Sequence, residues 1–224
     1  MKKIPCLFKR EFFDNHTAIL LEELNTGYGH DGILNNPDFN SLYYMTIKWD
    51  GAACAFINGY FYKRYDLKPG RKLPKDRECI PCQGKADDIT GHFPHWIEVK
   101  ENSPDDKWFT QALINFFETD EIMNTDIGNM EIHDGTYECI GKHFQGNPYG
   151  LDDDFIVKHG ALTVEEKYPE IKELLIKNEY RLNYQLLREI LSMMNDEGIV
   201  IYERESNTPI YKIRKKDYSL TWKE

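Results

Sequence analysis

The chain has 224 residues, of which 41% are hydrophobic and 13% aromatic, enough for one ordinary globular domain with a sizeable core. Its formal net charge of −10 argues against a protein that binds nucleic acid through its whole surface. No apolar run reaches the roughly 18 residues of a membrane span, and the first residues lack the apolar stretch of a secretory signal. Two of the cysteines, Cys54 and Cys139, lie in apolar runs, which fits a reducing compartment. We therefore expect a soluble cytoplasmic protein with no membrane partner.

Loops and strands are expected along most of the chain. A segment rich in Gly, Asn and Asp at 27–40 predicts a loop, as does the Pro- and Gly-containing segment 68–76. Asn58 and Gly59 separate two apolar runs, a pattern typical of a tight β-hairpin. Alternating apolar residues predict strands at 42–48, 52–57, 60–65, 136–140, 155–162, 198–203 and 210–214.

Helices are fewer. Residues 107–122 place aromatic and aliphatic side chains at helical spacing. Thr163 and Glu166 have the spacing of a capping box, so a helix is expected to begin there and to reach about Lys177. A further amphipathic helix is expected at 180–194. These elements together predict an α+β fold, in which bent antiparallel sheets are flanked by helices.

Charged residues accompany several of the predicted strands. Lys48 ends one strand and begins the sequence K-W-D-G, and further on come Glu138 in T-Y-E-C-I-G, Glu197 in E-G-I-V-I-Y and Lys212 in K-I-R-K. A lysine held beside an acid and a glycine turn can form a covalent nucleotide on its nitrogen, once burial, a nearby cation or a metal frees its lone pair. The tetrapeptide K-W-D-G alone is more typical of an exposed turn, so the hypothesis depends on the later blocks that contain Glu138, Glu197 and Lys212.

In this order the blocks resemble motifs I, III, IV and V of the covalent nucleotidyltransferases, the superfamily of ATP-dependent polynucleotide ligases and capping enzymes. Longer strings resemble the small RNA ligase family that includes the vertebrate 5′-to-3′ RNA ligase. These strings are G-H-F-P-H-W at 91–96, I-G-x(4)-G-N-P-Y-G-L at 140–151, H-G-A at 159–161, E-G-I-V at 197–200 and L-x-W at 220–222. They extend from about Lys48 to the end of the chain, whereas residues 1–40 match weakly. The resemblance implies that residues 1–224 form a single nucleotidyltransferase domain of ATP-grasp-like fold, without the C-terminal OB-fold of larger ligases.

The resemblance also implies roles for single residues. Lys48 is the expected nucleophile, which would form a lysyl-adenylate with ATP. Asp50 is expected to orient Lys48 or the turn. Glu197 is the expected ligand of Mg²⁺, for which Mn²⁺ could substitute.

Nucleotide and phosphate contacts are expected from basic and polar residues of the same motifs. Glu138 would bind a ribose hydroxyl, His159 would lie near the adenine, and Arg64 would bind the ribose or the RNA 5′-phosphate. Lys212 and Arg214 are two residues apart and so share a strand face, which suits them to clamp phosphates, with Lys212 also expected to act in catalysis. A solvated strand end for Arg64, and an exposed cationic strand edge for the other pair, are the ordinary alternatives.

The expected function is that of an ATP-dependent, phosphodiester-forming RNA ligase in RNA repair, acting as a monomer. It would adenylylate itself on Lys48, transfer AMP to an RNA 5′-phosphate and join that end to a 3′-hydroxyl. A local basic groove for RNA is expected from the cations Arg64, Lys68, Arg71, Lys72 and Lys215. Two other functions stay open: a GTP-dependent capping-type guanylyltransferase, and a non-catalytic RNA-binding module of the same fold.

Two further features are ambiguous in the sequence. Cys79, Cys82, His92 and His95 have the composition of a zinc set, but their spacing departs from that of zinc fingers, so their role is left open. Tyr149 would either stack on a base or pack in the core.

Overall fold

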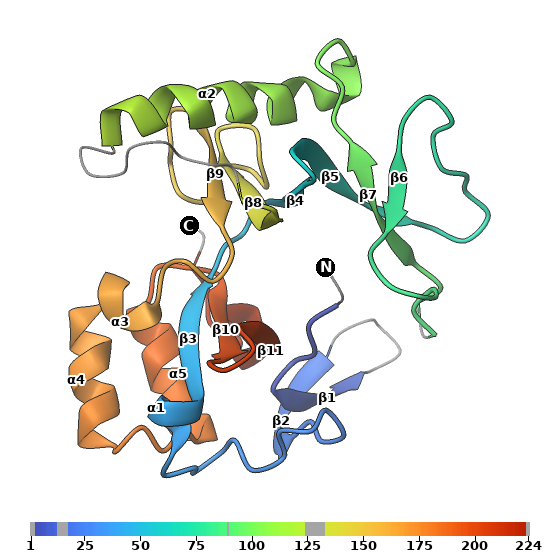
Figure 1. Cartoon of the computed structure of the whole chain (residues 1–224). Coiled ribbons are helices and arrows are strands. Elements are labelled where there is room, and N and C mark those ends of the chain that lie inside the picture. Colours follow the sequence, from blue (N-terminus) through green and yellow to red (C-terminus); the bar gives the residue numbers. More distant parts are fainter. Residues whose placement is uncertain (1–2, 13–17, 89, 124–132, 223–224) are drawn as a thin grey trace. The chain divides into compact units, whose positions relative to one another are not determined.

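The computed structural model describes residues 3–12, 18–88, 90–123 and 133–222 (Figure 1). These residues form two units: unit 1 contains Asp50–Lys158, and unit 2 contains Lys3–Trp49 and His159–Glu224. The division falls inside the K-W-D-G sequence, so Lys48 belongs to unit 2 and Asp50 to unit 1. A single nucleotidyltransferase domain stays a prediction.

Unit 1 is built on a six-stranded sheet with the strand order β6-β7-β5-β4-β8-β9. Every neighbouring pair is antiparallel. The predicted hairpin between β4 and β5 is present, because Asn58 and Gly59 both have the positive φ angles, 52° and 78°, that such a tight turn requires. The strands are β4 (Ala52–Ile57), β5 (Tyr60–Leu67), β6 (Cys79–Pro81), β7 (Phe93–Glu98), β8 (Gly135–Gly141) and β9 (Asp154–Lys158).

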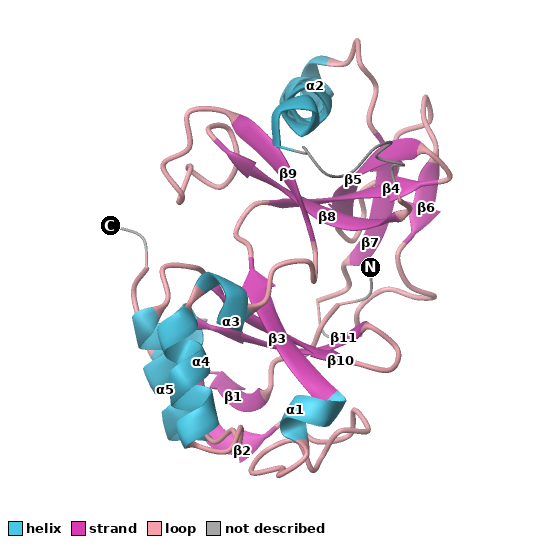
Figure 2. Cartoon of the chain, turned by 60° about the vertical axis from the view of Figure 1, so that its left-hand side comes forward, coloured by secondary structure: helices cyan, strands magenta, loops and turns pink. Residues whose placement is uncertain are grey.

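One face of the unit 1 sheet is covered by a long helix. The short 3₁₀ helix η1 (Pro104–Asp106) leads into α2 (Lys107–Met123), which lies across β8 and β9 in both views (Figures 1 and 2). The predicted helix at 107–122 is thus confirmed. Beneath α2, alternate strand residues form an apolar core with Ala112, namely Cys54, Phe56, Phe61, Tyr137, Cys139 and Ile156. The opposite face carries a smaller cluster of Ala55, Tyr62 and Trp96.

Unit 2 contains a three-stranded antiparallel sheet with the order β11-β10-β3. Its strands are β3 (Tyr43–Lys48), β10 (Gly198–Glu203) and β11 (Thr208–Arg214). Beside β11, Cys6 forms a parallel bridge with Lys212. The remaining elements are the strand pair β1 (Phe8–Phe12) and β2 (Ala18–Leu24), the short helix α1 (Phe39–Leu42) and the 3₁₀ helix η2 (Lys215–Tyr218).

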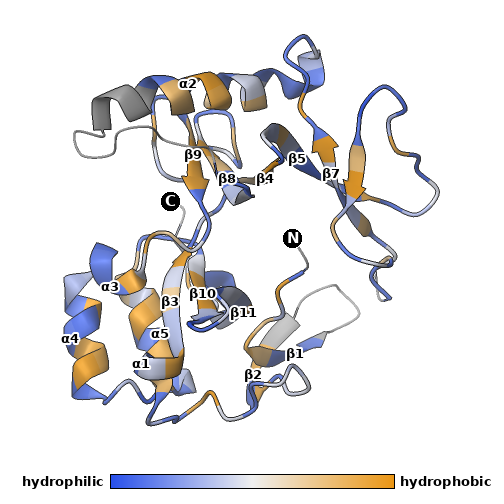
Figure 3. Ribbon diagram, viewed as in Figure 1, coloured by the Kyte–Doolittle hydropathy of each residue, from blue (hydrophilic) through white to orange (hydrophobic). Residues whose placement is uncertain are grey.

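Three helices complete unit 2: α3 (Val164–Lys167), α4 (Pro169–Lys177) and α5 (Tyr184–Met193). Figure 2 shows α4 and α5 side by side next to the three-stranded sheet. Hydrophobic positions gather on α5, while α4 carries both hydrophobic and hydrophilic ones (Figure 3). Their buried side chains share one core with the sheet, to which the helices contribute Ile171, Leu175, Leu187, Ile190 and Leu191.

The predicted α+β architecture with antiparallel sheets is confirmed, but two helix boundaries were wrong. The capping box of Thr163 and Glu166 is present, yet the helix breaks at Tyr168 (φ −129°, ψ 82°). The following residue, Pro169, has no N–H and disfavours a helical residue before it. The last helix begins at Tyr184, because Asn183 caps it and Tyr180 has a positive φ of 57°.

The strand boundaries also differ in places. The strand predicted at 155–162 ends at Lys158, since Gly160 turns the chain with a φ of 78°. Strands β1, β2, β6 and β7 were not predicted. No helix within the described residues is long and apolar enough to cross a membrane.

Candidate functional site

The register of the unit 2 sheet places three predicted cations together. Lys48 and Arg214 both lie opposite Gly198, and Lys212 lies opposite Val200, two residues further along β10. Residues opposite each other in a sheet point to the same face, as do residues two apart on one strand. Lys48, Lys212 and Arg214 therefore share one face of the sheet.

The opposite face of this sheet is apolar. The intervening residues Ile47, Ile199 and Ile213 are at most 3% exposed and pack into the core with α4 and α5. A slip of one residue in the register would drive the cations into this core and expose the isoleucines. Apolar burial on one face thus fixes the cations on the other.

Glu197 joins this cationic face although it lies 149 residues from Lys48 in the sequence. Its Oε2 forms an ion pair with Lys48 Nζ, which also lies 3.4 Å from the carbonyl oxygen of Trp49. The side chain of Glu197 is 12% exposed and that of Lys48 is 23% exposed, so Glu197 is nearly buried while Lys48 keeps access to solvent. The structure therefore brings together Lys48, Glu197, Lys212 and Arg214, all of which the sequence singled out.

Gly198 of E-G-I-V is required at its position for steric reasons. A Cβ on Gly198 would lie 2.8 Å from Cα of Arg214 and would collide with the backbone oxygen of Ile213. Only glycine allows β10 to approach β11 this closely directly after Glu197.

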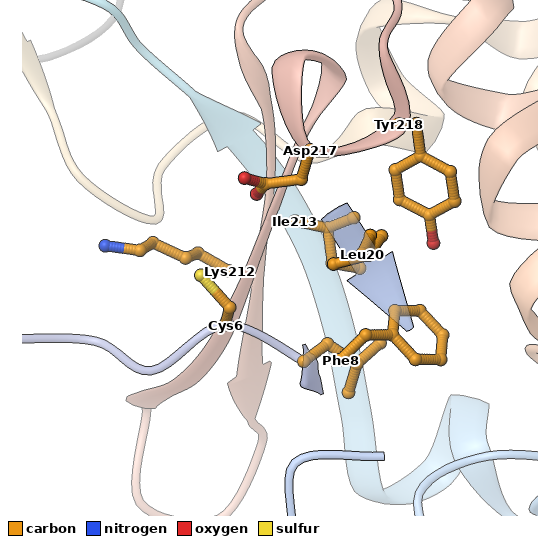
Figure 4. Close-up of a pocket in the computed structure, with 8 residues that line it drawn as sticks. Cys6, Phe8, Leu20, Lys212, Ile213, Asp217 and Tyr218 are labelled. Atoms are coloured by element: carbon orange, nitrogen blue, oxygen red, sulfur yellow. The ribbon is translucent and has the colours of Figure 1, made fainter. Parts of the chain in front are cut away.

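Lys212 has an altered protonation equilibrium. The pKa of Lys212 is lowered to about 8, chiefly by burial; Cys6 raises it, and the nearby positive charges of Arg214, Lys48 and Arg10 lower it. Figure 4 shows the small pocket beside Lys212, with the Lys212 side chain extending away from the rings of Phe8 and Tyr218. The pocket lining is mainly apolar and consists of Cys6, Leu7, Phe8, Leu20, Lys212, Ile213, Asp217 and Tyr218.

Arg214 is held by Asp217, a residue that the sequence analysis missed. Asp217 accepts hydrogen bonds from Nε at 2.9 Å and from Nη2 at 2.7 Å. Burial is the largest single effect and disfavours the charged guanidinium, but the hydrogen bond and the negative charge of Asp217, together with smaller effects of Cys6 and Glu197, raise the pKa of Arg214. Asp217 also lies 3.7 Å from Nη1 of Arg10. The spacing Arg-x-x-Asp in the sequence could have indicated this contact. The two side chains meet because η2 turns the chain directly after Arg214.

The residues predicted around Asp50 meet in unit 1. The Asp50 N–H donates to the hydroxyl oxygen of Tyr149 at 2.8 Å, and the Gly51 N–H donates to Oε1 of Glu138 at 3.1 Å. A Cβ on Gly51 would lie 2.9 Å from Cγ of Glu138 and would collide with Cys139. The glycine of K-W-D-G is therefore required by the close approach of β4 to β8.

Arg64 and Glu138 lie on the face of the unit 1 sheet that is opposite α2. Glu138 lies opposite Ala53 of the central strand β4, and the β4–β5 register continued by one residue places Arg64 on its other side. Two strand spacings separate them, about 10 Å. Arg64 also donates through Nε to Asp66 at 3.0 Å. Glu138 points away from its buried neighbours Tyr137 and Cys139, as predicted.

His159 belongs to a segment that runs beside β3. The Ile47 N–H donates to the carbonyl oxygen of Leu162 at 3.0 Å, and Thr163 forms an antiparallel bridge with Thr46. Since the two segments are antiparallel, His159 lies toward the end of β3 that carries Lys48.

The structure corrects one sequence interpretation and bears on another that was left open. Lys215 was expected in an RNA groove, but it is 4% exposed and its Nζ contacts the carbonyl oxygen of Met194, so it is not a surface cation. Within the described residues, no group of three or more His, Cys, Asp or Glu side chains is placed to hold a metal ion. The structure therefore does not gather Cys79, Cys82, His92 and His95 into a zinc set.

The chain is an α+β protein whose lysine–glutamate pair lies beside two further cations on an antiparallel sheet. It is related in sequence to curated proteins named RNA ligase 1, the relationship that its motifs indicated. The proteins of that name from Rattus norvegicus and Mus musculus are each 26% identical over 220 aligned positions, and the match covers 73% of this chain and 67% of the relative. RNA ligase 1 of Pongo abelii is 28% identical over 101 residues, covering 38% of this chain and 31% of the relative. No protein-family model matches the chain.

The lowered pKa of Lys212 predicts a pH-dependent stability. Because the pKa is 10.5 for an ordinary lysine and about 8 in the fold, the folded chain binds fewer protons than the unfolded chain between these values. The contribution of Lys212 to the free energy of unfolding therefore rises from about pH 8 to about pH 10.5. Lys212→Met should reduce this rise by about 1–3 kcal/mol, allowing for partial exposure.

Urea denaturation of both proteins, near neutral pH and near pH 10, measures the difference. Lys177→Met on the exposed end of α4 is the control and should follow the unsubstituted chain. Parallel pH dependences of the unsubstituted chain and Lys212→Met would contradict the prediction.

Proposed function

We propose that the chain is an ATP-dependent RNA ligase that joins an RNA 5′-phosphate to a 3′-hydroxyl through a lysyl-AMP intermediate. The observation that carries this proposal is the ion pair of Lys48 and Glu197, with Lys212 and Arg214 on the same sheet face. The relationship to proteins named RNA ligase 1 supports RNA as the substrate class.

Lys48 is the nucleophile of the proposed first step. An ammonium group has no lone pair, so Lys48 first gives up a proton to solvent. Its Nζ then attacks the α-phosphorus of ATP, a P–N bond forms, and the P–O bond to the leaving pyrophosphate breaks. The position of Lys48 at the end of β3 supports this role, because its backbone is fixed in the sheet while its side chain stays partly exposed.

Lys212 and Arg214 are suited to bind the ATP phosphates. The bidentate contact with Asp217 holds the guanidinium of Arg214 in one orientation, so little rearrangement is needed to meet a phosphate. Lys212 has a pKa of about 8, and a nearby triphosphate would favour its charged form.

Glu197 fits the proposed magnesium ion. Mg²⁺ in nucleotide enzymes is commonly bound by one or two carboxylates, together with water and substrate phosphates. Glu197 supplies such a carboxylate, of which Oε2 pairs with Lys48, whereas both oxygens of the neighbouring Asp196 are bonded, one to Lys167 and one to Tyr168. When bound, Mg²⁺ would offset negative charge on the phosphate oxygens.

The later steps transfer AMP to the RNA and then seal it. An RNA 5′-phosphate oxygen attacks the lysyl-AMP phosphorus and breaks the P–N bond, and the 3′-hydroxyl then attacks the activated 5′-phosphate with release of AMP. We assign ribose binding to Glu138, RNA-end binding to Arg64 and adenine contact to His159, with Asp50 orienting the turn. The position of Arg64 and Glu138 on one face of the unit 1 sheet supports the first two assignments.

Replacement of Lys48 tests the nucleophile. Lys48→Ala and Lys48→Arg should both abolish the covalent AMP adduct, because alanine has no amine and the guanidinium does not deprotonate. Intact mass after incubation with ATP and Mg²⁺ measures the adduct, and a parallel incubation with GTP tests the capping-type alternative. Lys177→Met should retain the adduct. An adduct in either Lys48 variant would reject this residue as the nucleophile.

Replacement of Glu197 tests the metal ligand. Glu197→Ala should slow adduct formation by about 100-fold or more, in line with several kcal/mol of lost charge stabilisation, and Glu197→Asp should recover part of the rate. Rates are measured across a Mg²⁺ titration, with circular dichroism to establish that each variant is folded. Equal rates for all three proteins at limiting Mg²⁺ would remove the assignment.

Substrate choice tests the RNA assignment. The chain should seal 5′-phosphorylated RNA and seal an all-DNA strand of the same sequence poorly, because the 2′-hydroxyl is the group that distinguishes RNA near the break. RNA binding should weaken as the salt concentration rises. Removal of any one of the cations Arg64, Lys68, Arg71 and Lys72 should reduce the slope of log K against log salt concentration by about 0.7. Gel analysis of ligated products gives the rates, and comparable sealing of RNA and DNA would overturn the RNA assignment.

A further inference from the structure

Lys167, the last residue of α3, contacts both sequence neighbours of the Lys48–Glu197 pair. Its Nζ donates to Oδ1 of Asp196 at 2.9 Å and lies 5.0 Å from the ring centroid of Trp49. Trp49 directly follows Lys48, and Asp196 directly precedes Glu197. One side chain therefore links the two chain segments that bear the nucleophile and the metal ligand.

Asp196 makes this link rigid. It is 0% exposed, and its second carboxylate oxygen accepts a hydrogen bond from the Tyr168 hydroxyl at 2.7 Å. That hydroxyl in turn accepts from the Asn195 N–H at 2.8 Å. A buried carboxylate is costly unless it is paired, so Asp196 is restricted to the position where Lys167 and Tyr168 meet it.

Residues 194–197, which include Asp196, are also bonded to η2. Nζ of the buried Lys215 contacts the carbonyl oxygen of Met194, and the Lys215 N–H donates to the carbonyl oxygen of Glu197 at 2.9 Å. Residues 194–197 are thus bonded on two sides before Gly198 enters β10. The backbone of Glu197 has little freedom to move relative to Lys48.

We infer that Lys167 is a positioning residue for the reaction proposed above, fixing through Trp49 and Asp196 the placement of Lys48 relative to Glu197. The inference rests on the proposed function. A purely stabilising role explains the arrangement less well, since buried ion pairs often stabilise a protein no more than apolar residues of similar size. A fixed geometry at the reacting groups is what such a pair provides, and a misplacement of about 1 Å there can cost two orders of magnitude in rate.

The test compares variants of Lys167 in the rate of lysyl-AMP formation, at saturating ATP and as a function of ATP concentration. Lys167→Met keeps the length of the side chain and removes its charge, while Lys167→Arg keeps the charge. The double variant Lys167→Met with Asp196→Asn removes both charges and so leaves no unpaired carboxylate in the interior. Lys172→Met, an exposed lysine of α4, is the matched control.

Lys167→Met and the double variant should lower the maximal rate at least about tenfold, with less than about a twofold change in the half-saturating ATP concentration, because positioning acts on the reacting atoms. Lys167→Arg should restore most of the rate, and Lys172→Met should behave as the unsubstituted chain. Thermal melting gives the folded fraction of each variant.

Four outcomes count against the inference. An unchanged maximal rate in the folded double variant overturns it and leaves the proposed function in place. So does a loss seen only as weaker ATP binding, or a loss that Lys167→Arg fails to restore. If the unsubstituted chain forms no adduct, the proposed function fails, and the inference fails with it.

Discussion

The antiparallel register of β3, β10 and β11 is the constraint on which the unit 2 site depends. Because side chains alternate between the faces of a sheet, the burial of Ile47, Ile199 and Ile213 determines that Lys48 and Arg214 lie together on the other face. The isoleucines thus contribute both the hydrophobic stabilisation of the unit and the placement of its charged groups.

Positive charges placed this close repel one another, and the fold offsets that repulsion with two carboxylates. Glu197 pairs with Lys48, and Asp217 pairs with Arg214. Lys212 lies among these cations with a pKa lowered to about 8 by burial and by its neighbours. A polyanion brought to this face would meet one oriented guanidinium and one lysine whose charge it can itself stabilise.

The relatives and the site support different parts of the proposed function. Relatives named RNA ligase 1 indicate ligation and RNA, at an identity of 26% over 73% of the chain. The side chains of unit 2 support the proposed chemistry, since a lysine paired with a carboxylate and flanked by two further cations suits nucleotidyl transfer. An α+β fold alone would support neither conclusion, because one fold serves many activities.

The sequence alone determined the antiparallel α+β class, the hairpin at Asn58 and the set of charged residues in or beside the strands, because alternation, turn residues and motif order are encoded within a few neighbouring positions. Only the tertiary structure decided which distant residues meet, as Lys48 does with Glu197 and Lys167 with Asp196. It also decided that Lys215 is buried, although its sequence neighbours read as an exposed basic run. Burial and ion pairing depend on partners far along the chain, so they cannot be predicted from the neighbouring residues alone.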